Sequence, residues 1–204
     1  MEFHIENTQV YGLDKAIIAS GNSYRTEMKN NDEKADEKDL KRAFTLGNTK
    51  PGEGHDQFLA GIVVEFDLYA PLYMWKQLQR YKFLDFVSSQ STMHTLTKFN
   101  IEDQCVESTD RLILKRYNEL ILNYFAAKES KLYTKEDLET FWRVLVASLP
   151  CGFVLGSTMV TNYRSLKTMY LQRKNHRLKE WHEFCSWCET LPYFKELILN
   201  KEEK

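Results

Sequence analysis

Four residues that could hold an anion, Gln77, Arg80, Tyr81 and Lys82, lie close together in the first half of the chain. Arginine offers a planar fork of N–H donors that matches a phosphate, and lysine adds a compact positive charge. Gln77 and Arg80 are three residues apart, so a helix that runs to about Tyr81 would place them on one face. The hydroxyl-rich run at residues 88–92 could supply further donors. The alternative is that Arg80 and Lys82 only complement the negative end of the helix dipole.

A second set of basic residues, Arg164, Arg173 and Arg177, comes late in the chain. Arg173 and Arg177 are four residues apart, so the helical pattern predicts that they share one face with Leu166 and Tyr170. A bound anion would offset the cost of burying such a basic pair. The alternative is that the aliphatic stems pack on the core while the charged ends reach water.

The third candidate is His176 together with His182, Cys185 and Cys188, residue types that zinc binds. Steps of three residues drift around a helix, however, and structural zinc sites usually take ligands from two chain segments. A redox-active cysteine pair would need a strand-to-helix turn, whereas the flanking pattern is that of a helix interior. We therefore expect buried free cysteines here and no metal site.

The elements that must position these residues can be read from periodicity. Residues 62–69 alternate between apolar and polar, which predicts a strand with one buried face. Pro71 suits the first turn of the helix that follows, because its missing N–H would be unpaired there. Residues 82–107 lack a helical period and are expected to form a loop with short structured pieces. The apolar run at residues 10–19 predicts a strand or a short helix.

The rest of the chain is mostly helical in pattern. Thr134 and Asp137 resemble a capping box, and Asn162 is expected to cap the helix that carries Arg164 and Arg173. Residues 151–160 could be a strand or an irregular buried segment. Further helices are predicted at residues 108–128, 134–148, 178–191 and 193–199. Several helices with a small antiparallel sheet predict the α+β class.

Composition limits the function. The 204 residues fit a single domain, and 28 basic against 29 acidic side chains give a net charge of −1. We therefore expect no nucleic acid as partner, and no membrane, since no stretch approaches the ~20 apolar residues of a spanning helix. Residues 25–50 are expected to form an exposed, charged loop and helix. Residues 1–20 do not resemble a signal peptide, and four cysteines suit a reducing, cytoplasmic location.

One block of the sequence resembles the flavin-dependent thymidylate synthases. Gly54-His55-Asp56 stands where that family commonly has Gly-His-Glu, and Ala70-Pro71 falls at its strand-to-helix junction. Gln77 and Arg80-Tyr81-Lys82 fall on its Gln and Arg-His-Arg positions.

A second block resembles the same family in the expected order. Leu149-Pro150 matches its Leu-Pro, and Asn162-x-Arg164-Ser165-Leu166 matches its Asn-x-Arg-Ser-Leu. Arg173 falls on the arginine that follows on the same helix. The two blocks together cover most of residues 40–190.

The resemblance implies an α+β fold that assembles as a homotetramer. It implies FAD as cofactor, dUMP or a related pyrimidine nucleotide as substrate, methylenetetrahydrofolate as carbon donor and NADPH as reductant. The residues that would line the flavin are Arg80, Tyr81, Lys82, Asn162 and Arg164. The residues that would face the nucleotide are Gln77, Ser88, Ser89, Gln90 and Arg173. The resemblance assigns no catalytic residue.

The sequence also departs from the family's pattern. Tyr81 replaces the middle histidine, Val87-Ser88 the Asn-Glu pair, and Thr92-Met93 the closing Arg-Tyr. Val146 stands where the family has a further arginine. Three hypotheses follow: a divergent flavin-dependent methylase, a non-catalytic scaffold of the same fold that binds a nucleotide or a protein, and an unrelated helical interaction protein.

Overall fold

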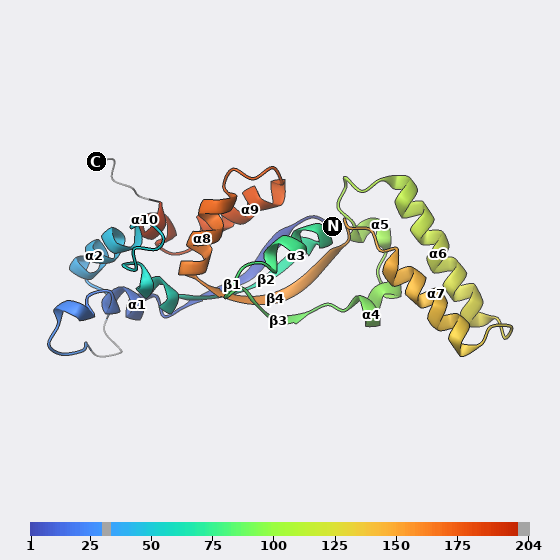
Figure 1. Cartoon of the computed structure of the whole chain (residues 1–204), viewed down its shortest axis with the longest axis horizontal. Coiled ribbons are helices and arrows are strands. Elements are labelled where there is room, and N and C mark those ends of the chain that lie inside the picture. The colour runs from blue at the N-terminus through green and yellow to red at the C-terminus, as the bar shows by residue number, and fades with distance from the viewer. Residues whose placement is uncertain (30–33, 200–204) are drawn as a thin grey trace. The chain divides into compact units, whose positions relative to one another are not determined.

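The fold is α+β, as the sequence predicts (Figure 1). A computed structural model describes residues 1–29 and 34–199. Four strands form one antiparallel sheet in the order β1-β2-β4-β3. Their bounds are β1 His4–Tyr11, β2 Val63–Pro71, β3 Asp85–Ser89 and β4 Val154–Asn162.

The described residues divide into two compact units. The first unit holds residues 1–4, 68–77 and 88–157, and the second unit holds residues 5–29, 34–67, 78–87 and 158–199. All four strands run from one unit into the other. That residues 1–204 form a single domain stays a prediction.

Strand β2 has the pleat that its alternating sequence predicts. Val64, Phe66 and Leu68 are buried, while Glu65 is exposed. The chain then enters helix α3 (Leu72–Leu78) directly after Pro71. The helix ends three residues before the predicted Tyr81, whose N–H donates to the Leu78 carbonyl in a turn.

The second unit packs its helices around large aromatic side chains. Its elements are α1 Leu13–Ala19, η1 Asn22–Tyr24, α2 Glu37–Gly47, η2 Gln57–Gly61, α8 Tyr163–Arg173, α9 Lys179–Cys188 and α10 Phe194–Ile198. Trp181, Tyr163, Phe184 and Phe194 are fully buried. The Tyr163 hydroxyl donates to the Pro192 carbonyl over 2.8 Å, so this core ring also fixes the turn before α10.

The first unit is built around a helical hairpin. Helices α6 (Arg111–Glu129) and α7 (Lys135–Ala147) run side by side (Figure 1). Its short elements are α4 Thr92–Thr95, η3 Leu96–Lys98 and α5 Ile101–Gln104. Tyr117 is buried between the two helices and donates to the Leu145 carbonyl over 2.9 Å. The capping box of Thr134 and Asp137 is confirmed.

Two features differ from the sequence expectation. Helix α6 begins after Asp110, which caps the N–H groups of Leu112 and Ile113, and not at residue 108. Residues 85–89 form strand β3 inside the predicted loop. Every residue of β3 is exposed, so no buried face left an alternating pattern in the sequence.

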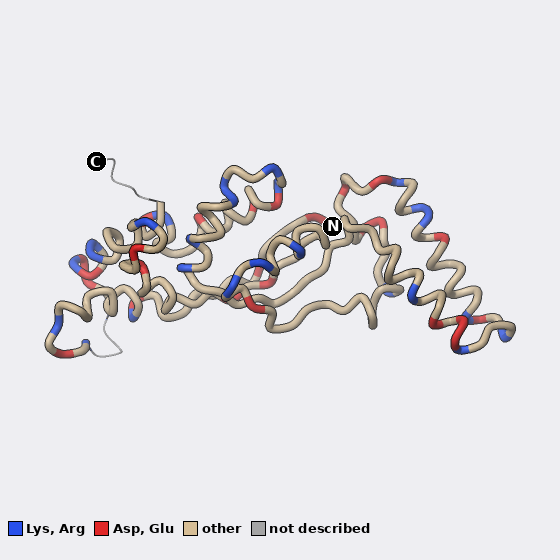
Figure 2. Tube along the Cα trace, viewed as in Figure 1, with Lys and Arg blue, Asp and Glu red and all other residues tan. Residues whose placement is uncertain are grey.

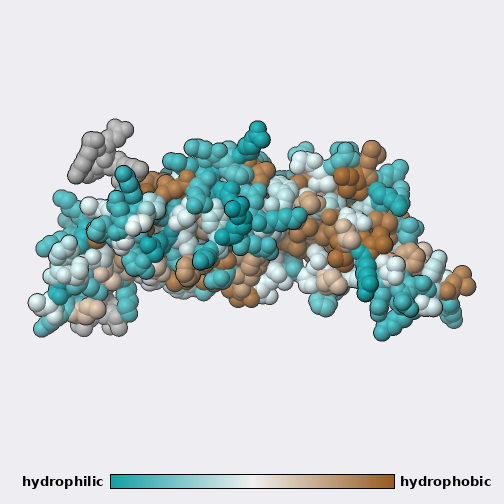
Figure 3. All heavy atoms as spheres, viewed as in Figure 1, coloured by the Kyte–Doolittle hydropathy of each residue, from teal (hydrophilic) through white to brown (hydrophobic). Residues whose placement is uncertain are grey.

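The hairpin leaves large apolar side chains in solvent (Figure 3). Leu112 is 75% exposed, Leu122 67% and Leu132 90%. Among the described helices, none combines the length and apolar character needed to cross a membrane.

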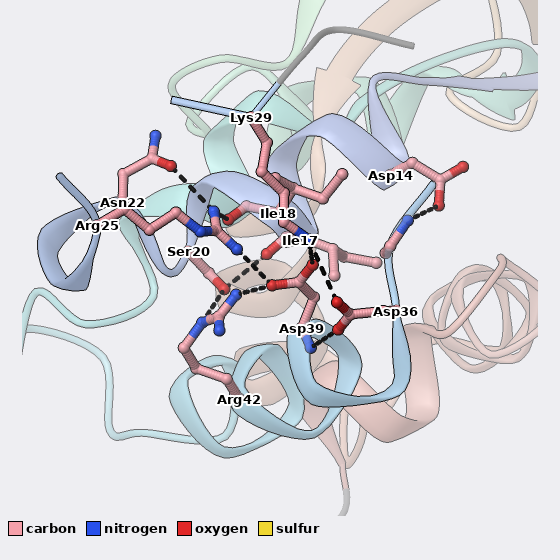
Figure 4. Close-up of polar contacts among 11 residues, drawn as sticks. Asp14, Ile17, Ile18, Ser20, Asn22, Arg25, Lys29, Asp36, Asp39 and Arg42 are labelled. Atoms are coloured by element: carbon pink, nitrogen blue, oxygen red, sulfur yellow. Dashed lines mark hydrogen bonds and ion pairs between the residues drawn. The ribbon is translucent and has the colours of Figure 1, made fainter. Parts of the chain in front are cut away.

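The charged segment contains a buried ionic cluster. Residues 30–33 of it lie outside the described residues. Lys and Arg alternate with Asp and Glu along α2 (Figure 2), but the helix buries Asp39 on its inner face. Asp39 is within 2.6 Å of Arg25 and 2.9 Å of Lys29, and it also pairs with Arg42 (Figure 4). Asp36 caps the helix by accepting from the Asp39 N–H at 2.7 Å.

Asp39 therefore makes the charged segment part of the folded core. Burial by itself would raise the pKa of Asp39, but hydrogen bonds from Arg42 and Lys29 outweigh it and hold that pKa well below its ordinary value. The carboxylate ties residues 25–29 to helix α2.

We expect Asp39→Asn to lower the free energy of unfolding by about 3 kcal/mol at neutral pH, because it leaves three cations without their carboxylate. The depressed pKa means that this stabilisation is complete above the unfolded-state pKa of about 3.9 and is lost as the pH falls below it. Urea unfolding should show the gap between variant and wild type shrinking between pH 7 and pH 3. The exposed neighbour Glu37 serves as control, and Glu37→Gln should change stability by less than about 0.5 kcal/mol. A gap that stays constant with pH would contradict this account.

Candidate functional site

A cavity of about 760 Å³ lies within the second unit. Three chain segments line it: the loop at residues 51–60, the turn after α3, and helix α8 with its N-cap. The lining residues are Pro51, Gly52, Asp56, Gln57, Ala60, Arg80, Tyr81, Lys82, Phe83, Asn162, Arg164, Ser165, Thr168 and Gln172. All five residues assigned to the flavin by resemblance, Arg80, Tyr81, Lys82, Asn162 and Arg164, are among them. Their role as cofactor ligands stays a prediction.

The start of α8 is fixed by Asn162, as the sequence predicts. Its side chain accepts from the Ser165 N–H at 3.0 Å, so Asn162 is the N-cap. Asn162, Arg164 and Ser165 all line the cavity. The positive end of the helix dipole and a guanidinium therefore lie at the same wall, an arrangement that favours an anionic ligand.

A buried ion pair positions this wall against the loop at residues 51–60. Lys167 and Asp56 are each 2% exposed, and their Nζ and Oδ2 atoms are 2.7 Å apart. The same Nζ donates to the carbonyls of Gly47 at 2.8 Å and Thr49 at 2.7 Å. All three ammonium N–H donors thus have acceptors, which is the condition for burying a lysine without a large penalty.

Asp56 also holds Arg164. Its Oδ1 accepts from the Arg164 Nε at 3.2 Å. Among the described residues, no other acceptor is found for this guanidinium. The four N–H donors on its terminal nitrogens therefore remain for a ligand in the cavity.

Tyr81 joins the turn after α3 to α8 and α9. Its hydroxyl accepts from the Arg173 Nε at 2.6 Å and donates to Gln172 at 3.1 Å. The Arg173 guanidinium lies 4.7 Å from the ring centroid of the buried Trp181 and 5.5 Å from that of Tyr81. Arg173 is thus held by cation–π contacts and one hydrogen bond. The rings of Trp181 and Tyr81 therefore fix the position of the Arg173 guanidinium beside the turn.

Two expectations about shared helical faces are wrong. Gln77 lies in α3, but Arg80 follows the end of that helix, so the pair does not share a face. Helix α8 ends at Arg173, and the His176 N–H donates to the Arg173 carbonyl in the turn beyond it. Arg177 is exposed outside the helix and does not continue its buried stripe.

The residues assigned to the nucleotide are divided between the units. Gln77, Ser88, Ser89 and Gln90 belong to the first unit, and Arg173 belongs to the second. Ser88 and Ser89 are exposed on β3. These five residues therefore do not form one pocket within either unit, and their role stays a prediction.

Gln90 already has a structural partner. Its backbone N–H donates to the Gly156 carbonyl at 2.9 Å, and its side-chain Oε1 accepts from the Gly156 N–H at 2.8 Å. The side chain continues the strand pairing beyond the end of β3, which leaves the amide NH₂ for any other contact.

The late cysteines are buried and free, which confirms the interpretation of this motif. Burial, with a smaller effect of Glu189, raises the pKa of Cys185 to about 11. Burial also raises the pKa of Cys188 well above its ordinary value. Within residues 1–29 and 34–199, no cluster of three or more His, Cys, Asp or Glu suited to a metal is found.

Lys167, Phe83 and Gln172, which support or line the cavity, were not identified from the sequence. Lys167 is three residues after Arg164, yet nothing local separates a buried lysine from a surface one. Phe83 gave no signal, because it stands in a stretch without periodicity. Asp56 was identified from the sequence only because Gly54-His55-Asp56 resembles a family motif.

The fold of the chain is similar to known structures, although no protein-family model and no curated protein sequence matches it. Flavin-dependent thymidylate synthase ThyX from Helicobacter pylori, complexed with FAD and dUMP, aligns with a TM-score of 0.68 at 16% identity, covering 98% of both chains. A second structure of that protein with FAD and dUMP gives 0.67 at 15% identity, covering 98% of this chain and 97% of the other.

A UMP/dUMP methylase, PolB from Streptomyces cacaoi bound with 5-Br dUMP, gives a TM-score of 0.63 at 14% identity. The match covers 96% of this chain and 94% of that one. At such low identities the likeness shows the fold, and it extends over nearly the whole chain.

A double-mutant cycle should test the buried pair. Lys167→Met and Asp56→Asn are each expected to lower the free energy of unfolding by about 3–5 kcal/mol, because each leaves the other partner buried without its counter-charge. The double variant should lose clearly less than the sum of the two single losses. Chemical denaturation gives the three values, and Lys174→Met, an exposed lysine just past α8, is the matched control. Additive losses would show that Asp56 and Lys167 do not act as a pair.

Proposed function

We propose that this chain is a divergent flavin-dependent thymidylate-synthase-like protein. It would methylate dUMP, or a related pyrimidine nucleotide, using FAD, methylenetetrahydrofolate and NADPH. We propose further that it works in the cytoplasm as a homotetramer.

One observation carries the proposal. Five residues from two motifs about 80 positions apart meet at one cavity, in a chain with the ThyX fold. An accidental sequence match gives no reason for Arg80, Tyr81 and Lys82 to lie beside Asn162 and Arg164. This convergence argues against an unrelated helical interaction protein.

The cavity suits FAD in size and charge. Its volume of about 760 Å³ lies in the usual range for ligand pockets. Arg80, Lys82 and Arg164 supply positive charge. Asp56 is the one carboxylate among the described lining residues, and Lys167 neutralises it. A dianionic pyrophosphate would therefore meet a net positive wall.

The residues of the chain would bind and orient the cofactor. Arg164, held at Nε by Asp56, would bind a phosphate with its terminal nitrogens. Arg80 and Lys82 would add charge from the neighbouring turn, and Ser165 at the start of α8 would add a donor. A bound flavin would supply the hydride chemistry, which no side chain can provide.

The alternative is a non-catalytic scaffold of the same fold that binds a nucleotide or a protein partner. The residues assigned to the nucleotide favour the non-catalytic scaffold. Oε1 of Gln90 is bound to the Gly156 N–H, and Val87-Ser88 and Thr92-Met93 replace the family's polar pairs. A scaffold would keep the flavin-lining cavity and lose turnover.

Self-association is supported by the hairpin of the first unit. Leu112, Leu122 and Leu132 expose large apolar side chains that a monomer would leave in water. Light scattering coupled to size exclusion should give the mass of a tetramer.

Wild-type protein is expected to bind FAD, measured by titration of flavin absorbance. Arg164→Ala should weaken binding by about 10-fold or more, because a charge-assisted hydrogen bond contributes about 1.5–3 kcal/mol. Lys174→Ala removes a charge just beyond the same helix and should leave FAD affinity unchanged. Wild-type protein that stays free of FAD at micromolar concentrations would eliminate the proposed function.

Release of tritium from dUMP labelled at carbon 5 separates the enzyme from the scaffold. The enzyme should release tritium in a dUMP-dependent reaction with FAD, NADPH and methylenetetrahydrofolate. The scaffold should bind FAD and release none. The measurement uses the same preparation as the FAD titration, so a negative result cannot be ascribed to unfolded protein.

A further inference from the structure

Phe83 has a backbone conformation that bulky residues rarely adopt. Its φ is +60°, in the left-handed region where Cβ crowds the backbone of L residues. Among the described residues, two other non-glycine residues have positive φ. Asn7 is of a type that tolerates this region. Tyr193 is 42% exposed, and its ring packs against Phe44, with centroids 5.8 Å apart.

Hydrogen bonds on both sides hold the turn around Phe83. Thr161 Oγ1 donates to the Phe83 carbonyl at 2.7 Å, and Ser165 Oγ reaches the Lys82 carbonyl at 3.5 Å. Tyr81 is bonded to α8, and Leu84 is buried. Consecutive residues are thus each fixed, which is the condition under which a strained conformation persists.

Core packing does not explain the Phe83 ring. The residue is 67% exposed and lines the cavity. Exposing an apolar ring to water is unfavourable, and so is the strained backbone at Phe83. A ligand that contacts the ring would offset these costs. Gly52 also lines the cavity, and no atom lies within 4 Å of the position that a Cβ at Gly52 would take. The cavity therefore has open space next to Gly52.

We propose that Phe83 is the platform on which the planar ring system of the bound ligand stacks. This inference rests on the proposed function and names the part of the ligand that Phe83 recognises. Arg80 and Lys82 flank Phe83 in sequence and line the same cavity, so phosphates and a flat heterocycle would be held by adjacent residues. An aromatic ring can stack on the face of such a heterocycle whichever hydrogen-bonding groups the heterocycle carries at its edge.

The test compares variants at this one position by FAD titration. Phe83→Gly and Phe83→Asn remove the ring while suiting the positive φ, so both should keep or raise the melting temperature. Both should raise the Kd for FAD by about 10-fold, the usual order for loss of one stacked ring. Phe83→Tyr keeps the ring and should stay within about 2-fold of wild type, whereas Phe83→Leu keeps apolar bulk without a ring face and should be weakened.

Inorganic pyrophosphate is the second probe. Its binding, followed by calorimetry, should be unchanged in Phe83→Gly, because it has no ring to stack. A Phe83→Gly protein that binds FAD as tightly as wild type would overturn the inference and leave the proposed function standing. A changed oligomeric mass with unchanged FAD affinity would also overturn it, because the ring would then cover a protein contact. Wild-type protein that does not bind FAD at micromolar concentrations would remove both proposals.

Discussion

The ammonium of Lys167 joins parts of the chain that are about 110–120 residues apart. Its three donors reach two backbone carbonyls, at Gly47 and Thr49, and the carboxylate of Asp56. Lys167 therefore anchors to α8 the loop that forms one side of the cavity. Arg164, one helical turn earlier, is oriented by the same carboxylate. The position of the loop and the direction of the guanidinium depend on a single buried charge pair.

The other side of the cavity depends on aromatic packing. Arg173 lies against Trp181 and Tyr81, and its Nε donates to the Tyr81 hydroxyl. The phenol of Tyr81 provides a hydrogen-bonded link from the turn to α8. The same fixed turn presents Phe83 at the cavity.

The sequence predicts the elements that have a buried face. The period of two in β2 and the caps at Asn162 and Thr134 are local signals, and the structure has the corresponding elements. Strand β3 was missed because all its residues are exposed. Helix α3 is shorter than predicted, and Tyr81 in the turn after it is hydrogen-bonded to α8, far away in sequence.

Only part of the site could be predicted from the sequence. Arg80 and Arg164 could be found from residue type and motif, and they line one cavity. Lys167 could not be found, because its burial is set by acceptors about 110–120 residues away. Phe83 could not be found either, since a positive φ in a bulky residue leaves no trace in composition or spacing.

The cavity has two kinds of positive charge, and added salt would separate them. Mobile ions screen exposed charges over about 10 Å at 0.1 M ionic strength and reach a buried pair much less. Arg80 and Lys82 are exposed, whereas Lys167 is buried. Raising the ionic strength would therefore weaken the long-range attraction of an anionic ligand while the anchored loop keeps its shape. The exposed Arg80 and Lys82 would thus govern the rate of ligand association, and the buried Lys167 would govern the shape of the cavity.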